Sequence, residues 1–416
     1  MTTTTTAAAT GGLRGLLRGS AGIAVAMAVM NVATYAFQMV AARVLGPAAY
    51  GAIASLMALL MVIAVLQLGL QATAARRISA TPENVAQIEH VIMGVTYRAA
   101  FGLGAVMLVA SPAVWVLLRL DSVLPAILLA ISAVPLTIMG GQAGILQGER
   151  RWGPLAAIYL GVGVPRVLIG TICIAISPTE TSAMLGVMIG LFVPALAGWW
   201  ALRRGREAGA TSDLHEARPM AGETARNSAA LLAFFVLSNA DIVVARNVLD
   251  SHAAGLYAGG LILTKAVLFL PQFVVVVAFP SMSTVEERRK ALLRSLALVL
   301  GLGVLCTLGA LVLSGVAMVF VGGSDYDEIQ SRLWAFAVLG TLLSMLQLLV
   351  YSVLARQGTR STWFVWAAVL ALLLASVWVA TLGGLLALVV VVDGALFALL
   401  LALSLWRMRA PAAPAA

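Results

Sequence analysis

The chain has very few charged residues: Asp, Glu, Lys and Arg make up only 10% of its 416 residues. A soluble domain usually has about 25%. Hydrophobic residues make up 62% of the chain, and the mean hydropathy is +1.02. This balance excludes a soluble enzyme with a large core and predicts an integral membrane protein.

Cysteine and histidine are also scarce. The two cysteines, Cys173 and Cys306, both lie within apolar runs, which excludes a disulfide framework or a zinc site. The three histidines are scattered and have no metal-ligand spacing. We therefore expect no metal site and no cofactor.

The N-terminal residues 1–19 are of low complexity and predict a disordered cytoplasmic tail. The apolar run that follows, Ser20–Ala42, exceeds a signal-peptide core of roughly 7–15 residues. No small-residue cleavage pattern follows it. The run therefore predicts a first membrane helix that stays in the mature protein.

Twelve apolar runs have about the 20 residues that a membrane-spanning helix needs. These predicted spans are 20–42, 50–70, 92–117, 124–146, 155–176, 182–201, 227–248, 254–280, 291–320, 333–354, 361–380 and 384–406. A charged segment divides them into two groups of six. The predicted organisation is thus an N-terminal bundle (20–201), a cytoplasmic linker (202–226), a C-terminal bundle (227–406) and a cytoplasmic tail (407–416).

The distribution of basic residues predicts the orientation, because cytoplasmic loops carry an excess of Lys and Arg. With a cytoplasmic N-terminus, 19 of the 26 Lys and Arg residues fall in inside segments and four at outside ends. Both termini are therefore predicted to be cytoplasmic in a multi-pass protein of the cell membrane. The same distribution explains the net charge of +9, so no nucleic-acid partner is required.

The two halves contain similar segments about 200–210 residues apart. AARVLGPAAYGAIASL (Ala41–Leu56) is similar to VARNVLDSHAAGLYAGGL (Val244–Leu261), and ILQGERRW (Ile145–Trp152) to VLARQGTRSTW (Val353–Trp363). Six helices between copies leave the copies parallel. We therefore predict an all-α polytopic membrane protein, with two parallel six-helix repeats around a central cavity.

These segments, with LQLGLQATAARR (Leu66–Arg77) and FPSMS (residues 279–283), resemble the polysaccharide-export flippases. Those proteins belong to the multidrug/oligosaccharidyl-lipid/polysaccharide (MOP) exporter superfamily, with the O-antigen flippases, lipid II flippases and MATE drug exporters. The resemblance covers roughly Gly22–Arg360. It implies an alternating-access transporter that moves polyprenyl-diphosphate-linked saccharides to the outer leaflet. Twelve spans rather than the fourteen of lipid II flippases argue against lipid II as the substrate.

Ionisable residues within the spans are the candidate site, because a buried charge is costly and usually marks a transport pathway. Asp241 and Lys265 fall at similar depths in spans seven and eight and are predicted to pair. Either the pair sets the register of the hairpin, or Lys265 meets the diphosphate while Asp241 balances it. A further role for Asp241 is to bind a coupling proton or sodium ion.

Arg166 follows Pro165 in the middle of span five, where a guanidinium could donate two parallel hydrogen bonds to diphosphate oxygens. Arg43 and Arg246 occupy equivalent outer positions and suit either snorkelling or a headgroup contact. Asn239 and Gln38 could bind sugar hydroxyls, or could simply join helices. Asp393 stands alone in span twelve, and its role is left open between a structural pair and an accessory function.

The predicted function is a non-enzymatic flippase for lipid-linked oligosaccharides, whose partners are that substrate and the bilayer. A MATE-like cation-coupled drug exporter is the first alternative, but its cavity would need to be acidic or aromatic. A membrane glycosyltransferase or polymerase is the second, but the outer loops are short.

Overall fold

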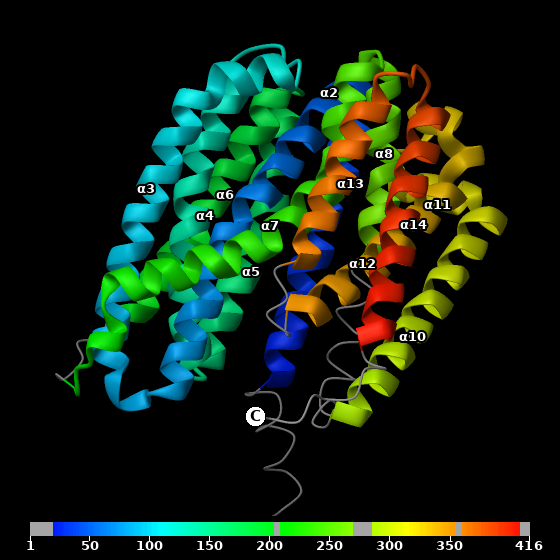
Figure 1. The fold of residues 1–416 in the computed structure, drawn as a ribbon. Coiled ribbons are helices and arrows are strands. Elements are labelled where there is room, and N and C mark those ends of the chain that lie inside the picture. The colour runs from blue at the N-terminus through cyan, green and yellow to red at the C-terminus, as the bar shows by residue number, and fades with distance from the viewer. Residues whose placement is uncertain (1–19, 204–208, 269–284, 355–359, 408–416) are drawn as a thin grey trace, which may run out of the picture. The chain divides into compact units, whose positions relative to one another are not determined.

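The computed structural model describes residues 20–203, 209–268, 285–354 and 360–407, and these residues form only helices and their connections (Figure 1). The α-helices are α2 (Ser20–Ala80), α3 (Val85–Leu117), α4 (Leu124–Gly148), α5 (Trp152–Ile176), α6 (Glu180–Leu202), α7 (Ala217–Val248), α8 (Ser251–Leu268), α10 (Val285–Val312), α11 (Ser314–Val321), α12 (Leu333–Leu354), α13 (Arg360–Ser376) and α14 (Leu382–Arg407). Three 3-10 segments are η1 (Pro82–Asn84), η2 (Asp213–His215) and η4 (Ser324–Arg332). The predicted all-α membrane class is confirmed.

The predicted spans correspond to these helices. Nine helices in the described part of the chain are long and apolar enough to cross a membrane, and α13 is a shorter apolar helix. The predicted span 291–320 is divided between α10 and α11. The end of the predicted span 254–280, the FPSMS segment and the 355–359 part of the second repeat lie outside the described residues.

The first two predicted spans form the two parts of α2, which runs through 61 residues. At Gly46 the backbone leaves the helical conformation, with φ 70° and ψ 173°. This positive φ is accessible to glycine at little cost, and the following Pro47 starts the next helical part because a first-turn position needs no N–H bond. The Gly-Pro pair therefore makes the break between the spans.

The described residues form two compact units. Unit 1 contains those within 1–44 and 59–229, and unit 2 those within 45–58 and 230–416. The boundary therefore crosses α2 twice and α7 once: Ala217–Ala229 belongs to unit 1 and the rest of α7 to unit 2. The predicted division at 20–201 and 227–406 stays a prediction.

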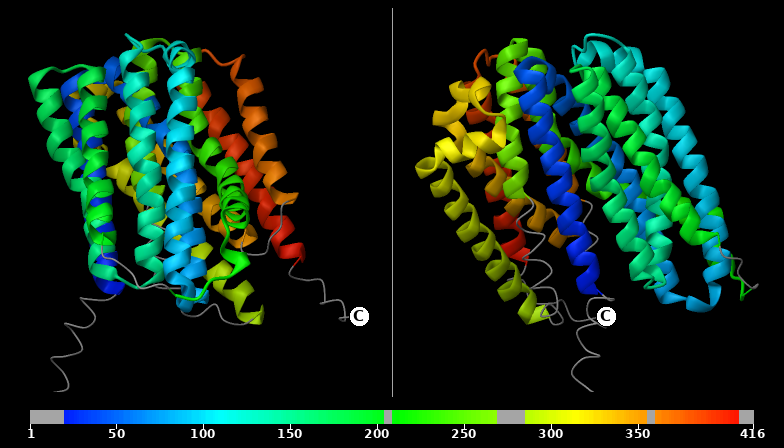
Figure 2. Two further views of the ribbon diagram at one scale, coloured as in Figure 1. Left: turned by 90° about the vertical axis from the view of Figure 1, so that its left-hand side faces the viewer. Right: turned by 180° about the vertical axis from the view of Figure 1, so that it is seen from behind.

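In unit 1, α4 is the most buried helix and packs against α3, α5 and α6 (Figure 2). Three of its glycines, Gly140, Gly144 and Gly148, recur at four-residue spacing and face α2. A Cβ on Gly144 would lie 2.6 Å from the carbonyl oxygen of Gln71. Small residues at this spacing let helix backbones approach closely, which membrane helices use for association.

In unit 2, α12 contacts α8, α10 and α14, while α13 packs on α14. The glycines of α8 allow similarly close contacts: Gly255 meets the Pro47 region of α2, and Gly260 meets the Phe336 ring. A Cβ on Gly51 would lie 3.0 Å from the Cα of Gly255. The two repeated segments, AARVLGPAAYGAIASL and VARNVLDSHAAGLYAGGL, thus cross each other at glycines.

Candidate functional site

Arg166 lies near the middle of α5, 14 residues after its first residue and ten before its last. At a rise of about 1.5 Å per residue, these offsets place it about 21 Å and about 15 Å from the two ends. The backbone here is held by close packing: a Cβ on Gly190 of α6 would lie 3.1 Å from the Cα of Arg166, and one on Gly163 would lie 2.7 Å from Met30. The α5 backbone around Arg166 is therefore tightly packed against its neighbouring helices.

The Arg166 side chain is partly buried and its Nε has no hydrogen-bond partner. Within the described residues the guanidinium forms neither a hydrogen bond nor an ion pair. A guanidinium carries five N–H donors that fit carboxylate or phosphate oxygens. Unit 1 therefore holds a cation near the middle of an apolar helix, and its donors have no partner within the described residues.

Lys265 and Asp241 lie in unit 2, in the α7–α8 hairpin. The Lys265 ammonium donates to the Ser238 carbonyl oxygen at 2.6 Å and to Asn239 Oδ1 at 3.0 Å. Asp241 accepts from the Ile242 backbone N–H at 2.9 Å and from the Tyr257 hydroxyl at 3.3 Å. The Lys265 ammonium thus reaches α7 at Ser238 and Asn239, on the side of Asp241 that lies further from the α7–α8 turn.

The predicted direct ion pair between Asp241 and Lys265 is wrong: the two interact electrostatically, but each makes its close contacts elsewhere. The hairpin geometry gives the reason. Asp241 on α7 lies opposite Tyr257 on α8. Lys265 is eight residues further from the α7–α8 turn than Tyr257, and its ammonium contacts Ser238 rather than Asp241. Asn239 and Asp241 are also about 200° apart around the helix, so they point to different sides.

Asp393 of α14 joins this group, which sequence reasoning did not foresee. Its side chain is 2% exposed, as is that of Asp241, and it interacts electrostatically with Asp241, Tyr257 and Lys265. Two buried carboxylates thus lie around one ammonium group, at a net charge of −1 when all three are ionised. We call Asp241, Tyr257, Lys265 and Asp393 the acidic cluster.

The remaining predicted residues divide between the units. Gln38 and Arg43 lie on the first part of α2 in unit 1, where Arg43 is exposed and both have polar partners. Arg246 lies in unit 2, is 5% exposed and donates to the Ala48 carbonyl oxygen at 3.5 Å. Their equivalent sequence positions predicted similar surroundings for Arg43 and Arg246. The structure differs, because Arg43 is exposed and Arg246 is buried.

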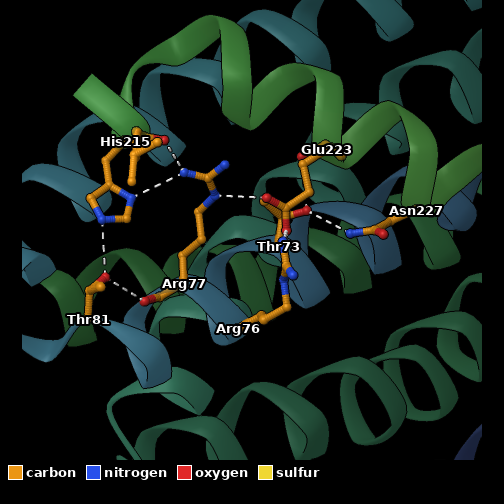
Figure 3. A network of polar contacts seen from close by, with 9 residues as sticks. Thr73, Arg76, Arg77, Thr81, His215, Glu223 and Asn227 are labelled. Atoms are coloured by element: carbon orange, nitrogen blue, oxygen red, sulfur yellow. Dashed lines mark hydrogen bonds and ion pairs between the residues drawn. The ribbon is translucent and has the colours of Figure 1, made fainter. Parts of the chain in front are cut away.

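A polar network covers the end of unit 1 that carries Arg76, Arg77 and the predicted linker (Figure 3). We call this end of the unit its basic end. Glu223, at the start of α7, accepts from Arg76 Nε at 2.9 Å and from Arg77 Nε at 2.9 Å. Arg77 also donates to the Leu214 carbonyl oxygen and to His215 Nδ1. Part of the predicted linker is therefore folded against the ends of α2 and α3.

His215 is neutral in this network. Its Nδ1 accepts from Arg77 at 3.1 Å, so the proton sits on Nε2, which contacts the Thr81 hydroxyl at 3.1 Å. Burial lowers the pKa of His215, the Arg77 charge lowers it further, and Glu83 opposes the shift. Among the described residues, no three His, Cys, Asp or Glu side chains are grouped to hold a metal ion.

Solved structures with this fold are membrane transporters. An inward-facing MATE multidrug resistance transporter of the MOP superfamily matches with a TM-score of 0.71 and 14% identity, over 92% of this chain and 94% of that one. The lipid II flippase MurJ in an inward closed conformation matches with a TM-score of 0.70 and 11% identity, over 93% and 88%. These likenesses confirm the MATE-like fold.

Sequence comparison gives the family. No curated protein sequence matches the chain. A family model described as "Polysaccharide biosynthesis protein" matches residues 16–286, well over half of the chain. The chain therefore belongs to the polysaccharide biosynthesis protein family and has the fold of MOP-superfamily transporters.

Proposed function

We propose that this protein is an alternating-access flippase that moves a polyprenyl-diphosphate-linked oligosaccharide from the inner to the outer leaflet for cell-surface polysaccharide synthesis. The observation that carries the proposal is the unpaired guanidinium of Arg166 near the middle of a spanning helix. An ionised side chain at that depth costs from about 2.5 kcal/mol upward, so it is retained for a function. A diphosphate would satisfy its donors in a bidentate manner.

We assign the first contact with the diphosphate to Arg166 rather than to Lys265. The Lys265 ammonium already donates to Ser238 and Asn239 and lies near two carboxylates. Arg166 has none of these partners. The orientation proposed from the basic residues puts the α5 N-terminus inside, so Arg166 meets a headgroup that enters from the cytoplasm.

The acidic cluster suits the coupling step. Two buried carboxylates near one ammonium carry a net negative charge when ionised, which a proton or sodium ion bound at Asp241 and Asp393 would neutralise. An inside-negative potential of about 100 mV also favours outward movement of each negative charge by about 2.3 kcal/mol. A potential and an ion gradient are therefore sufficient to drive the cycle, without ATP.

The experiment is transfer in proteoliposomes of a fluorescent polyprenyl diphosphate saccharide. We expect Arg166→Ala to lower the transfer rate at least about tenfold, since a charge-assisted contact contributes about 1.5–3 kcal/mol. Arg166→Lys should retain part of it. The control is Arg98→Ala, which removes an exposed arginine of α3 in the same unit.

Two further variants separate coupling from binding. Asp241→Asn and Asp393→Asn should remove the dependence of transfer on the ion gradient while binding of the labelled lipid persists. Transfer unchanged in Arg166→Ala would overturn the proposal. Folded wild type that moves cationic dyes but not the saccharide lipid would favour the drug-exporter alternative.

A further inference from the structure

Gln71, Gln147 and Tyr159 form a neutral polar cluster on the side of unit 1 that carries Arg166. Gln71 Nε2 donates to Gln147 Oε1 at 2.8 Å and to the Tyr159 hydroxyl oxygen at 3.0 Å. The three residues come from α2, α4 and α5. We call them the amide–phenol cluster.

Helix packing fixes the position of this cluster. Gly144 of α4 lies so close to α2 that a Cβ there would be 2.8 Å from the Cα of Gln71. Gln147 follows one helical turn later on α4. The close packing therefore keeps Gln71 and Gln147 side by side, and does not depend on the hydrogen bond between them.

The cluster keeps unused hydrogen-bonding groups. Within the described residues Gln147 makes no contact through its NH₂ group, and the Tyr159 hydroxyl accepts from Gln71 while its own proton has no acceptor. Gln71 Oε1 likewise accepts nothing. Three donors and one carbonyl acceptor are thus available, and none carries a charge. Gln147 is exposed and Tyr159 is partly buried, so an incoming molecule has access to these groups.

Tyr159 and Arg166 lie on the same face of α5. They are seven residues apart, which is about two helical turns and about 10 Å along the axis. Tyr159 is the nearer of the two to the α5 N-terminus, and so to the basic end of the unit. One helix face therefore presents a cation near mid-membrane and neutral donors about 10 Å closer to the basic end.

We propose that the amide–phenol cluster is a saccharide subsite that binds an uncharged sugar of the lipid-linked substrate while Arg166 holds the diphosphate. Neutral donors suit hydroxyl and acetamido oxygens, and offer no counter-charge for a uronic acid. This inference rests on the proposed function, because it needs Arg166 to anchor the headgroup. Tyr159 and Arg166 are about 10 Å apart along α5, so the sugars that bind this subsite are those closest to the diphosphate.

The test compares two fluorescent probes in proteoliposomes: a polyprenyl diphosphate with a neutral trisaccharide, and the same lipid diphosphate without sugar. The variants are Tyr159→Phe and Gln147→Glu. Gln147→Glu keeps the oxygen that accepts from Gln71 but replaces the NH₂ donors with a negative oxygen. The matched control is Tyr97→Phe, on an exposed tyrosine of α3 in the same unit.

We expect both cluster variants to slow transfer of the trisaccharide probe about 3- to 10-fold, the effect of losing about one hydrogen bond. Transfer of the sugar-free probe should not change, and Tyr97→Phe should affect neither probe. Equal slowing of both probes would show a merely structural cluster and overturn the inference. The proposed function fails separately, if Arg166→Ala leaves both probes unaffected.

Discussion

Glu223 accepts from two arginines that differ in exposure, and this difference predicts the outcome of a double-mutant cycle. The Arg76 side chain is 71% exposed, whereas those of Arg77 and Glu223 are 14% and 7% exposed. An exposed ion pair contributes about 0–1 kcal/mol, because water and salt screen it. Breaking a buried pair costs about 3–5 kcal/mol, because the remaining charge stays in a poor solvent.

We therefore expect Arg76→Gln to lower the free energy of unfolding by less than about 1 kcal/mol. Arg77→Gln should lower it by about 2–4 kcal/mol, less than the full cost because Arg76 still neutralises Glu223. The coupling energy between Arg77 and Glu223 should exceed about 2 kcal/mol, measured with Glu223→Gln as the second substitution. The coupling between Arg76 and Glu223 should stay below about 1 kcal/mol.

The assay is denaturant unfolding in nanodiscs, with hydrogen exchange of the segment that the network holds. Arg77 donates to the Leu214 carbonyl oxygen, so Glu223→Gln should speed amide exchange near Leu214. Exchange at Ser212 should change less, because its backbone N–H donates to Gln87 Oε1 at 2.8 Å. Equal coupling energies for Arg76 and Arg77 would refute the reasoning from burial.

The remaining predictions concern packing and pH. Gly163→Ala should lower the free energy of unfolding by about 1–3 kcal/mol, because the added Cβ would lie 2.7 Å from Met30. The matched Gly102→Ala should raise it by up to about 1 kcal/mol, because a Cβ there meets nothing within 4 Å. A thermal unfolding scan that ranks the two variants the other way would contradict the packing. Because the pKa of His215 is lowered from 6.5, the unfolded chain binds more protons, so the contribution of His215 to stability is complete above pH 6.5 and falls as the pH drops below that value. His215→Gln should flatten that part of the pH profile, and an unchanged profile would show that His215 does not titrate there.

Most of the fold could be predicted from the sequence, because a membrane helix is defined by a local property. A run of about 20 apolar residues gives a span wherever it occurs, and the gap between the predicted spans 20–42 and 50–70 contains Gly46, where α2 breaks. The division between α10 and α11 at Leu313 escaped prediction, since both sides of it are apolar. Boundaries outside the bilayer also moved: α2 continues to Ala80, ten residues beyond its predicted end.

The sequence identified most residues of the candidate site, but it did not predict which of them contact one another. Arg166, Asp241 and Lys265 stand out because charges are rare within spans. The approach of Asp393 to Lys265 depends on packing of α14 against α8, which no local pattern encodes. The charged composition of residues 202–226 predicted a cytoplasmic linker but not its contacts: Glu223 has its partners on α2, 146 and 147 residues away in the sequence.

The separation of the charges between the units restricts how coupling can work. Arg166 is in unit 1 and the acidic cluster is in unit 2. An ion bound at Asp241 and Asp393 changes the affinity of Arg166 for a diphosphate when the ion and the diphosphate favour different states of one conformational equilibrium. The effect must then be reciprocal: a tenfold change in diphosphate affinity on ion binding, about 1.4 kcal/mol, requires a tenfold change in ion affinity on diphosphate binding. Isothermal titration of each ligand with and without the other measures this coupling, and diphosphate affinity that does not change on ion binding would show that the two ligands do not act on one shared equilibrium.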